Sequence, residues 1–150
     1  ADALHLLKAQ QSALARRAAP VLLTPHHGEA MVLADGIAGW AEGGNKVEQA
    51  QRLAAAWGAH IVYKGADSVI AAPDGQAVIA DRRCSWLSVA GTGDVLAGCI
   101  AARLANHGRP FAALCEAVWL HDRAARIAGP AFSALELAGK LPEALEACLA

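Results

Sequence analysis

In several stretches of the chain, apolar residues recur at the spacing typical of helices. Leucines at positions 4, 7 and 14 fall on one face of a helix. Asn45 is a good N-cap, and Gly58 is a typical stop, for a helix between them. We therefore expect helices over residues 4–17, 28–35, 46–57, 95–107, about 111–127 and about 134–148, the last with a break near Pro142.

Short apolar runs between these segments predict buried strands. They cover residues 21–24, 60–65, 68–73 and 77–81. The last two are joined by Pro73-Asp74-Gly75-Gln76, whose composition favours a hairpin turn. Apolar strands with helices between them predict an α/β fold, with a sheet covered on both faces. The strands are few for such a sheet.

The composition excludes several classes of protein. The chain has 150 residues, of which 55% are hydrophobic and 18% charged, so it is not disordered, and we expect one domain over residues 1–150. The net charge of -1 supplies no basic surface for nucleic acid. No apolar run approaches the ~20 residues that a membrane-spanning helix needs.

Cysteine spacing and the first residues indicate a cytoplasmic protein. The cysteines at 84, 99, 115 and 148 form no C-x-x-C pair, which argues against zinc and against a redox dithiol. We expect free, buried thiols rather than two disulfides. The segment ADALHLLKAQQ lacks the pattern of a secretory signal.

Gly91-Thr92-Gly93-Asp94, at the start of an apolar helix, is the strongest candidate for chemistry. Glycines at a loop-to-helix junction let backbone N–H groups turn toward an anion, and the helix N-terminus adds partial positive charge. A carboxylate repels phosphate, so Asp94 suits a general base that takes a proton from an attacking hydroxyl. On these four residues alone, an ordinary helix cap explains the pattern as well.

Two further candidates follow buried strands, where ligands of open α/β sheets bind. In Lys64-Gly65-Ala66-Asp67-Ser68 the lysine can meet a phosphate and the serine can add a hydroxyl; an exposed lysine in a tight turn is the alternative.

The other segment is Thr24-Pro25-His26-His27-Gly28-Glu29. His26 can contact a substrate or relay a proton, and Glu29 either serves the site or complements a helix N-terminus. A metal site is not predicted, because adjacent side chains point apart and no third ligand has a familiar spacing. His121 is expected to be a satisfied helix histidine.

Taken together, these segments resemble the ADP/ATP-dependent NAD(P)H-hydrate dehydratase family of the ribokinase-like superfamily. The matching stretches, in order, are Asp2-Ala3-Leu4, VLLTPHHGEA, VYKGADSVIAAPDG, AGTGDVLAGCIAARLANHG and AVWLHDRAA. Family domains are usually well over two hundred residues long, so the chain resembles the C-terminal half of one. The resemblance implies a three-layer α/β/α fold with a mostly parallel central sheet, of which this chain would hold a part.

The resemblance also implies an activity and residue roles. Hydrated NADH or NADPH would be phosphorylated on its ring hydroxyl by ADP or ATP with Mg²⁺, and phosphate would then leave. Asp94 would be the catalytic base and touch the substrate, and Gly91, Thr92 and Gly93 would hold the phosphoryl group. Residues 64–68 would bind the nucleotide and His26 the substrate, in a homo-oligomer such as a tetramer. A ribokinase-like kinase of a sugar or vitamin, and a non-catalytic nucleotide-binding half-domain, are the alternatives.

Overall fold

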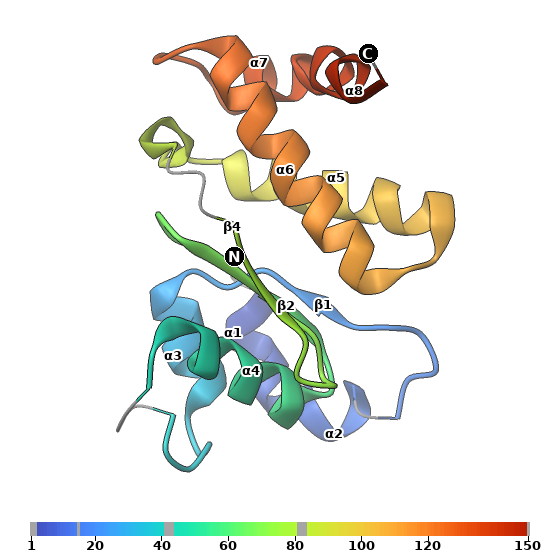
Figure 1. Ribbon diagram of the computed structural model, residues 1–150. Coiled ribbons are helices and arrows are strands. Elements are labelled where there is room, and N and C mark those ends of the chain that lie inside the picture. The colour runs from blue at the N-terminus through green and yellow to red at the C-terminus, as the bar shows by residue number, and fades with distance from the viewer. Residues whose placement is uncertain (1–2, 15, 41–43, 81–83, 150) are drawn as a thin grey trace. The chain divides into compact units, whose positions relative to one another are not determined.

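The protein is described by a computed structural model that covers residues 3–14, 16–40, 44–80 and 84–149. The chain divides into two compact units, residues 1–81 and 82–150. Figure 1 colours the first from blue to green and the second from yellow to red.

Unit 1 is built on a four-stranded sheet with strand order β1-β2-β3-β4. The strands are β1 (Leu22–Leu23), β2 (His60–Tyr63), β3 (Ser68–Ala71) and β4 (Ala77–Ala80). β1 pairs with β2 in parallel, whereas β3 joins β2 and β4 in antiparallel pairs. The carboxyl ends of β1 and β2 therefore lie at the same edge, which brings the loops after them together.

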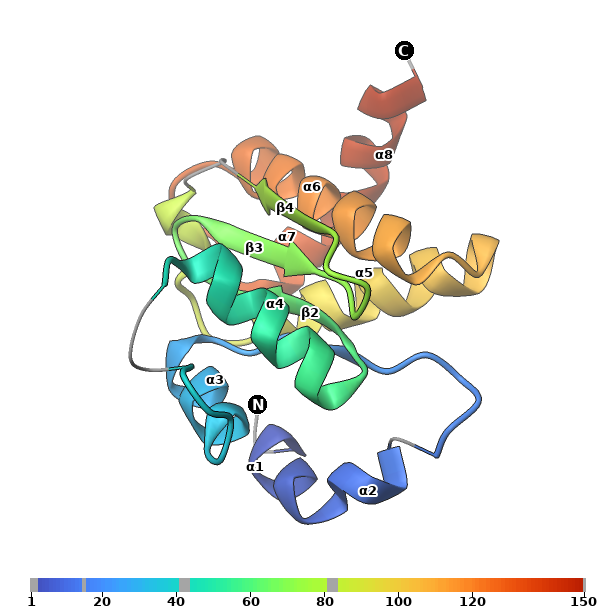
Figure 2. The ribbon, with the colours of Figure 1, turned by 60° about the horizontal axis from the view of Figure 1, so that its bottom comes forward.

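The helices of unit 1 are α1 (Ala3–Leu7), α2 (Gln11–Leu14), α3 (His27–Ala34) and α4 (Lys46–Trp57), with a 3₁₀ turn, η1 (Lys8–Gln10), between the first two. α4 packs on β2, β3 and β4, and Figure 2 shows it lying across the sheet. Its buried residues recur at helical spacing: Ala50, Leu53, Ala54 and Trp57. Full burial of a leucine such as Leu53 contributes roughly 1.5–3 kcal/mol.

Local chemistry fixes both ends of α4. The Asn45 side chain accepts hydrogen bonds from the N–H groups of Val47 and Glu48, at 3.0 and 3.1 Å. Gly58 ends the helix in the left-handed region, with φ of 56°. The predicted bounds of this helix are thus confirmed at both ends.

Unit 2 is helical in its described residues. It consists of a 3₁₀ turn, η2 (Ser85–Leu87), and helices α5 (Thr92–His107), α6 (Pro110–Ala128), α7 (Ala134–Gly139) and α8 (Leu141–Leu149). α6 packs against each of the other elements. Small buried residues on α6, such as Ala113 and Ala117, let its partners approach closely. Glu116 of α6 also accepts hydrogen bonds from Arg103 Nε (2.7 Å) and His107 Nε2 (3.1 Å) of α5.

Most predicted elements are confirmed, with two corrections. The continuous helix expected over residues 4–17 is wrong, because the chain tightens into η1 and α2 ends at Leu14. The helix expected from residue 95 begins at Thr92, inside the glycine segment. The hairpin at residues 73–76, the break between α7 and α8 and the mixed α/β class are all confirmed. Among the described strands only β1 and β2 are parallel.

The structure bears on two further expectations. All four cysteines are free thiols, but of these only Cys99 is buried: Cys84 and Cys115 are partly exposed and Cys148 is exposed. In the described ranges, no helix combines the length and the apolar character needed to cross a membrane.

Candidate functional site

The loops after β1 and β2 start side by side in unit 1. The Lys64 N–H donates to the Pro25 carbonyl at 2.8 Å. This hydrogen bond joins the two loops just after the ends of β1 and β2. His26 and Lys64 are therefore neighbours although 38 positions separate them in the sequence. The structure thus brings together the predicted substrate residue and the first residue of the predicted nucleotide segment.

Glu29 connects these two residues. Its side chain is only 3% exposed, and Oε2 accepts the His26 backbone N–H at 2.7 Å. The same oxygen lies 3.8 Å from Lys64 Nζ. Glu29 is therefore both the third-position residue of a capping box on α3 and the charge partner of Lys64. The predicted role of Glu29 at a helix N-terminus is confirmed, whereas its role in a functional site stays a prediction.

Both ring nitrogens of His26 face Glu29. Nδ1 accepts the Glu29 backbone N–H at 3.2 Å, so the neutral ring carries its proton on Nε2. Nε2 lies 3.5 Å from Glu29 Oε1, and the side chain is 60% exposed. A ligand can therefore reach the His26 ring, but its Nδ1 is not free to act as a base.

The turn from Lys64 to Ser68 is closed by its own side chains. Ser68 Oγ accepts the Gly65 N–H at 3.2 Å and lies 3.1 Å from the Gly65 carbonyl, to which it donates. The hydroxyl expected to meet a ligand is thus engaged within the turn. Ala66 and Asp67 are exposed at the tip.

Lys46, which sequence reasoning missed, also holds this turn. Its Nζ lies 2.8 Å from both the carbonyl oxygen and Oδ1 of Asp67. A hint was present in the sequence, because Lys46 is the first residue of α4, where the helix dipole disfavours a cation. Its partner, 21 positions away, was not visible there.

The adjacent histidines separate. His27 Nδ1 lies 2.6 Å from the hydroxyl of Tyr63, the last residue of β2, whereas His26 turns to Glu29. Burial raises the pKa of Tyr63, and the charge of Asp67 raises it further, so Tyr63 stays protonated. Across the described residues, no group of three or more His, Cys, Asp and Glu side chains is placed to hold a metal ion.

In unit 2, the glycine segment forms the entry to α5. Gly91 is the N-cap, with φ of 85°, and a Cβ built on it would lie 2.9 Å from Ala134 Cβ. Both facts require glycine at this position. The Thr92 side chain is buried, with its hydroxyl 2.8 Å from the carbonyls of Leu87 and Val89. Thr92 therefore fixes the approach to the helix, and its backbone N–H also donates to the Val89 carbonyl at 3.3 Å.

Asp94 is different, because its side chain is exposed in the first turn of α5. Its backbone N–H donates to the Gly91 carbonyl at 3.1 Å. Within the described part of the chain, its carboxylate takes part in no hydrogen bond or ion pair. Gly91 also supplies no side chain to cap the helix. An open carboxylate at the positive end of a helix can accept a proton from a ligand hydroxyl.

His121 of α6 supports this entry from within unit 2. The residue is 7% exposed, and its Nε2 lies 2.8 Å from the Thr92 carbonyl, to which it donates. The prediction of a satisfied helix histidine is confirmed. The next residue, Asp122, is buried and pairs with Arg126 one helical turn away, at 2.8 Å.

The predicted site residues thus form two groups. The strand-end group in unit 1 comprises His26 and residues 64–68, and the helix-start group in unit 2 comprises Gly91, Thr92, Gly93 and Asp94. Contacts join His26 to Lys64 through Glu29 within the first group. Gly93, half-buried in the first turn of α5, belongs to the second.

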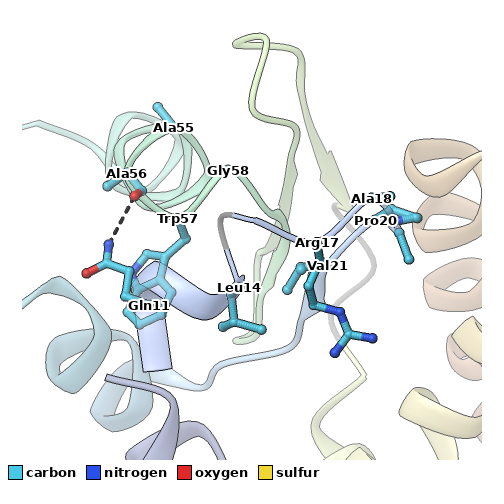
Figure 3. A pocket seen from close by; sticks show the side chains of 11 residues that line it. Gln11, Leu14, Arg17, Ala18, Pro20, Val21, Ala55, Ala56, Trp57 and Gly58 are labelled. Atoms are coloured by element: carbon cyan, nitrogen blue, oxygen red, sulfur yellow. Dashed lines mark hydrogen bonds between the residues drawn. The ribbon is translucent and has the colours of Figure 1, made fainter. Parts of the chain in front are cut away.

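A cavity in unit 1 lies away from the strand-end group. Its volume is about 410 Å³, and Figure 3 shows Gln11 beside the end of α4, where it donates to the Ala56 carbonyl at 3.1 Å, with Leu14 and Arg17 farther from that helix. Its lining includes Val21 and Gly58, which precede β1 and β2, whereas the strand-end group follows these strands. None of the predicted site residues lines it.

Comparison with known proteins gives a consistent result. A family model described as NAD(P)H-hydrate dehydratase matches residues 1–146. The chain is 42% identical over 124 residues to the bifunctional NAD(P)H-hydrate repair enzyme of Gloeobacter violaceus, which covers 83% of this chain and 24% of that enzyme. It is 34% identical over 129 residues to the ADP-dependent (S)-NAD(P)H-hydrate dehydratase of Neisseria meningitidis, which covers 85% of this chain and 43% of that enzyme.

A solved structure has the same fold. It is the ADP/ATP-dependent NAD(P)H-hydrate dehydratase from Bacillus subtilis co-crystallised with ATP and Mg²⁺, with a TM-score of 0.77 and 33% identity. The similarity covers 88% of this chain and 49% of that one. The chain therefore spans between about a quarter and a half of the length of these relatives. The prediction that it holds only part of the family's domain is confirmed.

Proposed function

The chain belongs to the NAD(P)H-hydrate dehydratase family, and from this premise we propose that it acts as an ADP-dependent (S)-NAD(P)H-hydrate dehydratase, with ATP as the alternative nucleotide. The names of the relatives from Neisseria meningitidis and Bacillus subtilis support both nucleotides. The substrate is NADH or NADPH whose nicotinamide ring has gained water. The product is the restored coenzyme.

The proposed reaction has two parts. The ring hydroxyl first attacks the terminal phosphorus of ADP, AMP leaves, and the hydroxyl proton passes to a base. Inorganic phosphate then leaves the ring together with a ring proton, and the ring double bond reforms. One ADP is thereby converted to AMP and phosphate for each coenzyme repaired.

Asp94 is the proposed base, and its setting is the observation that carries the proposal. Its carboxylate is exposed at the N-terminus of α5, and no partner engages it among the described residues. A base must reach the proton that it removes, and a carboxylate held by an ion pair would be weaker in this role. The dipole of α5 favours the negative phosphoryl group that lies next to such a base.

The other residues have binding roles in the proposal. Backbone N–H groups of Gly91, Thr92 and Gly93 hold the transferring phosphoryl, which gains charge in the transition state. Lys64 and the turn that follows it bind the nucleotide. His26, whose ring is 60% exposed, contacts the hydrated nicotinamide nucleotide.

Mg²⁺ fits this chemistry as a companion of the nucleotide. The described residues contain no cluster of three potential ligands, so the ion would be held by phosphate oxygens and water and would neutralise their charge. We further propose a homo-oligomer, such as a tetramer, in the cytoplasm. Light scattering of the purified protein measures the oligomeric state.

Two other functions are compatible with particular observations. A ribokinase-like kinase of a sugar or vitamin would use the same glycine segment and the same open carboxylate. A non-catalytic nucleotide-binding module would suit a chain that spans at most about half of its relatives. His26 beside Lys64 favours the dehydratase, because it adds a substrate contact next to the nucleotide segment.

The test is the recovery of NADH absorbance from hydrated NADH with Mg²⁺ and either ADP or ATP. The assay is run on the 150-residue chain and on the same chain joined to the N-terminal half of the Bacillus subtilis relative. We expect NADH and inorganic phosphate to appear in equal amounts. A phosphorylated product that accumulates would favour the kinase, and ADP binding without turnover in both forms would favour the binding module.

A further inference from the structure

Asp67 is an unexpected residue in a segment that binds a nucleotide. Its side chain is 55% exposed, in the turn that follows Lys64. A carboxylate in this place repels the phosphates that the lysine attracts. The repulsion between two unit charges about 4 Å apart near a protein surface is enough to weaken binding by tenfold or more.

Lys46 counters this charge directly. Its ammonium lies 2.8 Å from Asp67 Oδ1 and 2.8 Å from the Asp67 carbonyl oxygen, so it holds both the side chain and the backbone of the turn. The Lys46 side chain is only 22% exposed. An ion pair as exposed as this one adds little to fold stability, and a cation at the start of a helix is disfavoured. Stability alone therefore does not account for Lys46.

The surroundings of Lys46 fix where its ammonium lies. Nζ is 5.0 Å from the centre of the Tyr63 ring, a cation–π contact with a residue that is 2% exposed. On another side it lies so close to Gly65 that a Cβ at that position would collide with it. Tyr63, Gly65 and Asp67 thus hold the ammonium beneath the turn.

We propose that Lys46 is a positioning residue for the nucleotide: it neutralises Asp67 and holds the 64–68 turn in the shape that lets Lys64 meet phosphate. The inference rests on the proposed nucleotide role of this turn. It adds a residue from the start of α4 to the site. It also gives a reason for glycine at position 65, because a larger residue there would displace the ammonium.

The test is a set of variants measured for ADP affinity and, where the enzyme turns over, for the nucleotide KM and for kcat. The variants are Lys46→Met, Lys46→Arg, Asp67→Asn and the double variant Lys46→Met/Asp67→Asn. Lys140→Met is the matched control, since Lys140 forms a surface ion pair with Glu143 at 3.0 Å in unit 2. Thermal unfolding of each variant without ligand shows whether it folds.

We expect Lys46→Met to raise the ADP dissociation constant about tenfold and to leave kcat nearly unchanged. Lys140→Met should stay within about twofold of wild type, and Lys46→Arg should retain most of the affinity because it keeps the charge. The double variant should recover most of the affinity that Lys46→Met loses, because the Asp67 carboxylate is gone. The defect of Lys46→Met should also shrink at high salt, which screens the repulsion.

Each contrary result has its own meaning. If the double variant binds as weakly as Lys46→Met, Lys46 does not act through Asp67 and the inference is overturned. Equal ADP affinity of wild type and Lys46→Met overturns it as well. If wild type itself binds neither ADP nor ATP, the proposed nucleotide-binding function of the turn is contradicted, and so is this inference. If Lys46→Met does not fold, Lys46→Gln with and without Asp67→Asn gives the same comparison.

Discussion

In the strand-end group of unit 1 the charged side chains engage one another, whereas in the helix-start group of unit 2 the carboxylate of Asp94 faces solvent. Glu29 is buried between His26 and Lys64, and Lys46 holds Asp67. At the start of α5 the rigid parts are the backbone and the buried side chains that support it.

The difference matches two different tasks. A binding group gains affinity when it is already held in its bound position, because less freedom is lost on binding. A base must instead remain open to the proton that it removes. We therefore propose nucleotide binding chiefly for the strand-end group and proton removal for the helix-start group. The variants below test how each group is held, from the largest expected effect to the smallest.

Gly91→Ala should damage the helix-start group most. The left-handed φ of 85° strains any residue other than glycine, and the new Cβ would meet Ala134 Cβ at 2.9 Å. We expect the free energy of unfolding to fall by about 2–3 kcal/mol, measured by urea denaturation.

Gly108→Ala is the matched control for this variant. Its φ is 66°, and nothing lies within 4 Å of the new Cβ, so only the strain of about 1 kcal/mol should remain. Equal losses at positions 91 and 108 would show that the contact with Ala134 does not constrain the entry to α5.

Glu29→Gln should weaken the strand-end group by less. The amide still accepts the His26 N–H, but the charge that pairs with Lys64 at 3.8 Å is lost. We expect a loss of about 1–2 kcal/mol in the free energy of unfolding and a coupling of about 1 kcal/mol in a double-mutant cycle with Lys64→Met.

Glu136→Gln isolates the capping role. Glu136 forms the same capping box with Ser133 at the start of α7, but its side chain is exposed. The substitution there should cost only a few tenths of a kcal/mol. A coupling free energy near zero between Glu29 and Lys64 would show that Glu29 acts only as a helix cap.

Glu116→Gln should have the smallest effect, and one that depends on pH. Burial raises the pKa of the Glu116 carboxyl, but hydrogen bonds and charges from Arg103 and His107 outweigh it and hold the pKa below its usual value. Because the folded pKa is lowered, the stabilisation is present above the unfolded pKa of about 4.3 and is lost as the pH falls through the folded value.

Thermal unfolding from pH 7 to pH 3 checks this prediction. The Tm of Glu116→Gln should lie about 1–2 °C below that of wild type at pH 7, and the difference should vanish at the acid end. A gap that stays constant with pH would mean that the carboxylate charge does not join α5 to α6.

The parts of the fold that follow from local chemistry could be predicted from the sequence. Asn45 and Gly58 determine the two ends of α4 through contacts with residues close to them in the sequence, so both ends were predicted correctly. The helix expected over residues 4–17 failed, because its leucines indicate a buried face but not the tightening at η1.

The candidate site divides in the same way. Asp94 and the glycines before it lie in one short segment and could be recognised there. The packing of α4 on the sheet brings Lys46 to Asp67, 21 positions away. The pairing of β1 with β2 brings Glu29 to Lys64, 35 positions away. No local pattern marks them. Candidate reacting groups are therefore easier to recognise in the sequence than the contacts that position side chains.

The most direct test of the account compares Asp94→Asn with Lys64→Met for ADP affinity and for the rate of NADH recovery at saturating ADP. The account predicts that Asp94→Asn binds ADP about as well as wild type and loses roughly 10²–10⁴ in rate, because the amide keeps the shape and lacks the base. Lys64→Met should bind ADP more weakly and retain most of the rate. Undiminished turnover in Asp94→Asn, or loss of ADP binding in Asp94→Asn with binding intact in Lys64→Met, would contradict the account.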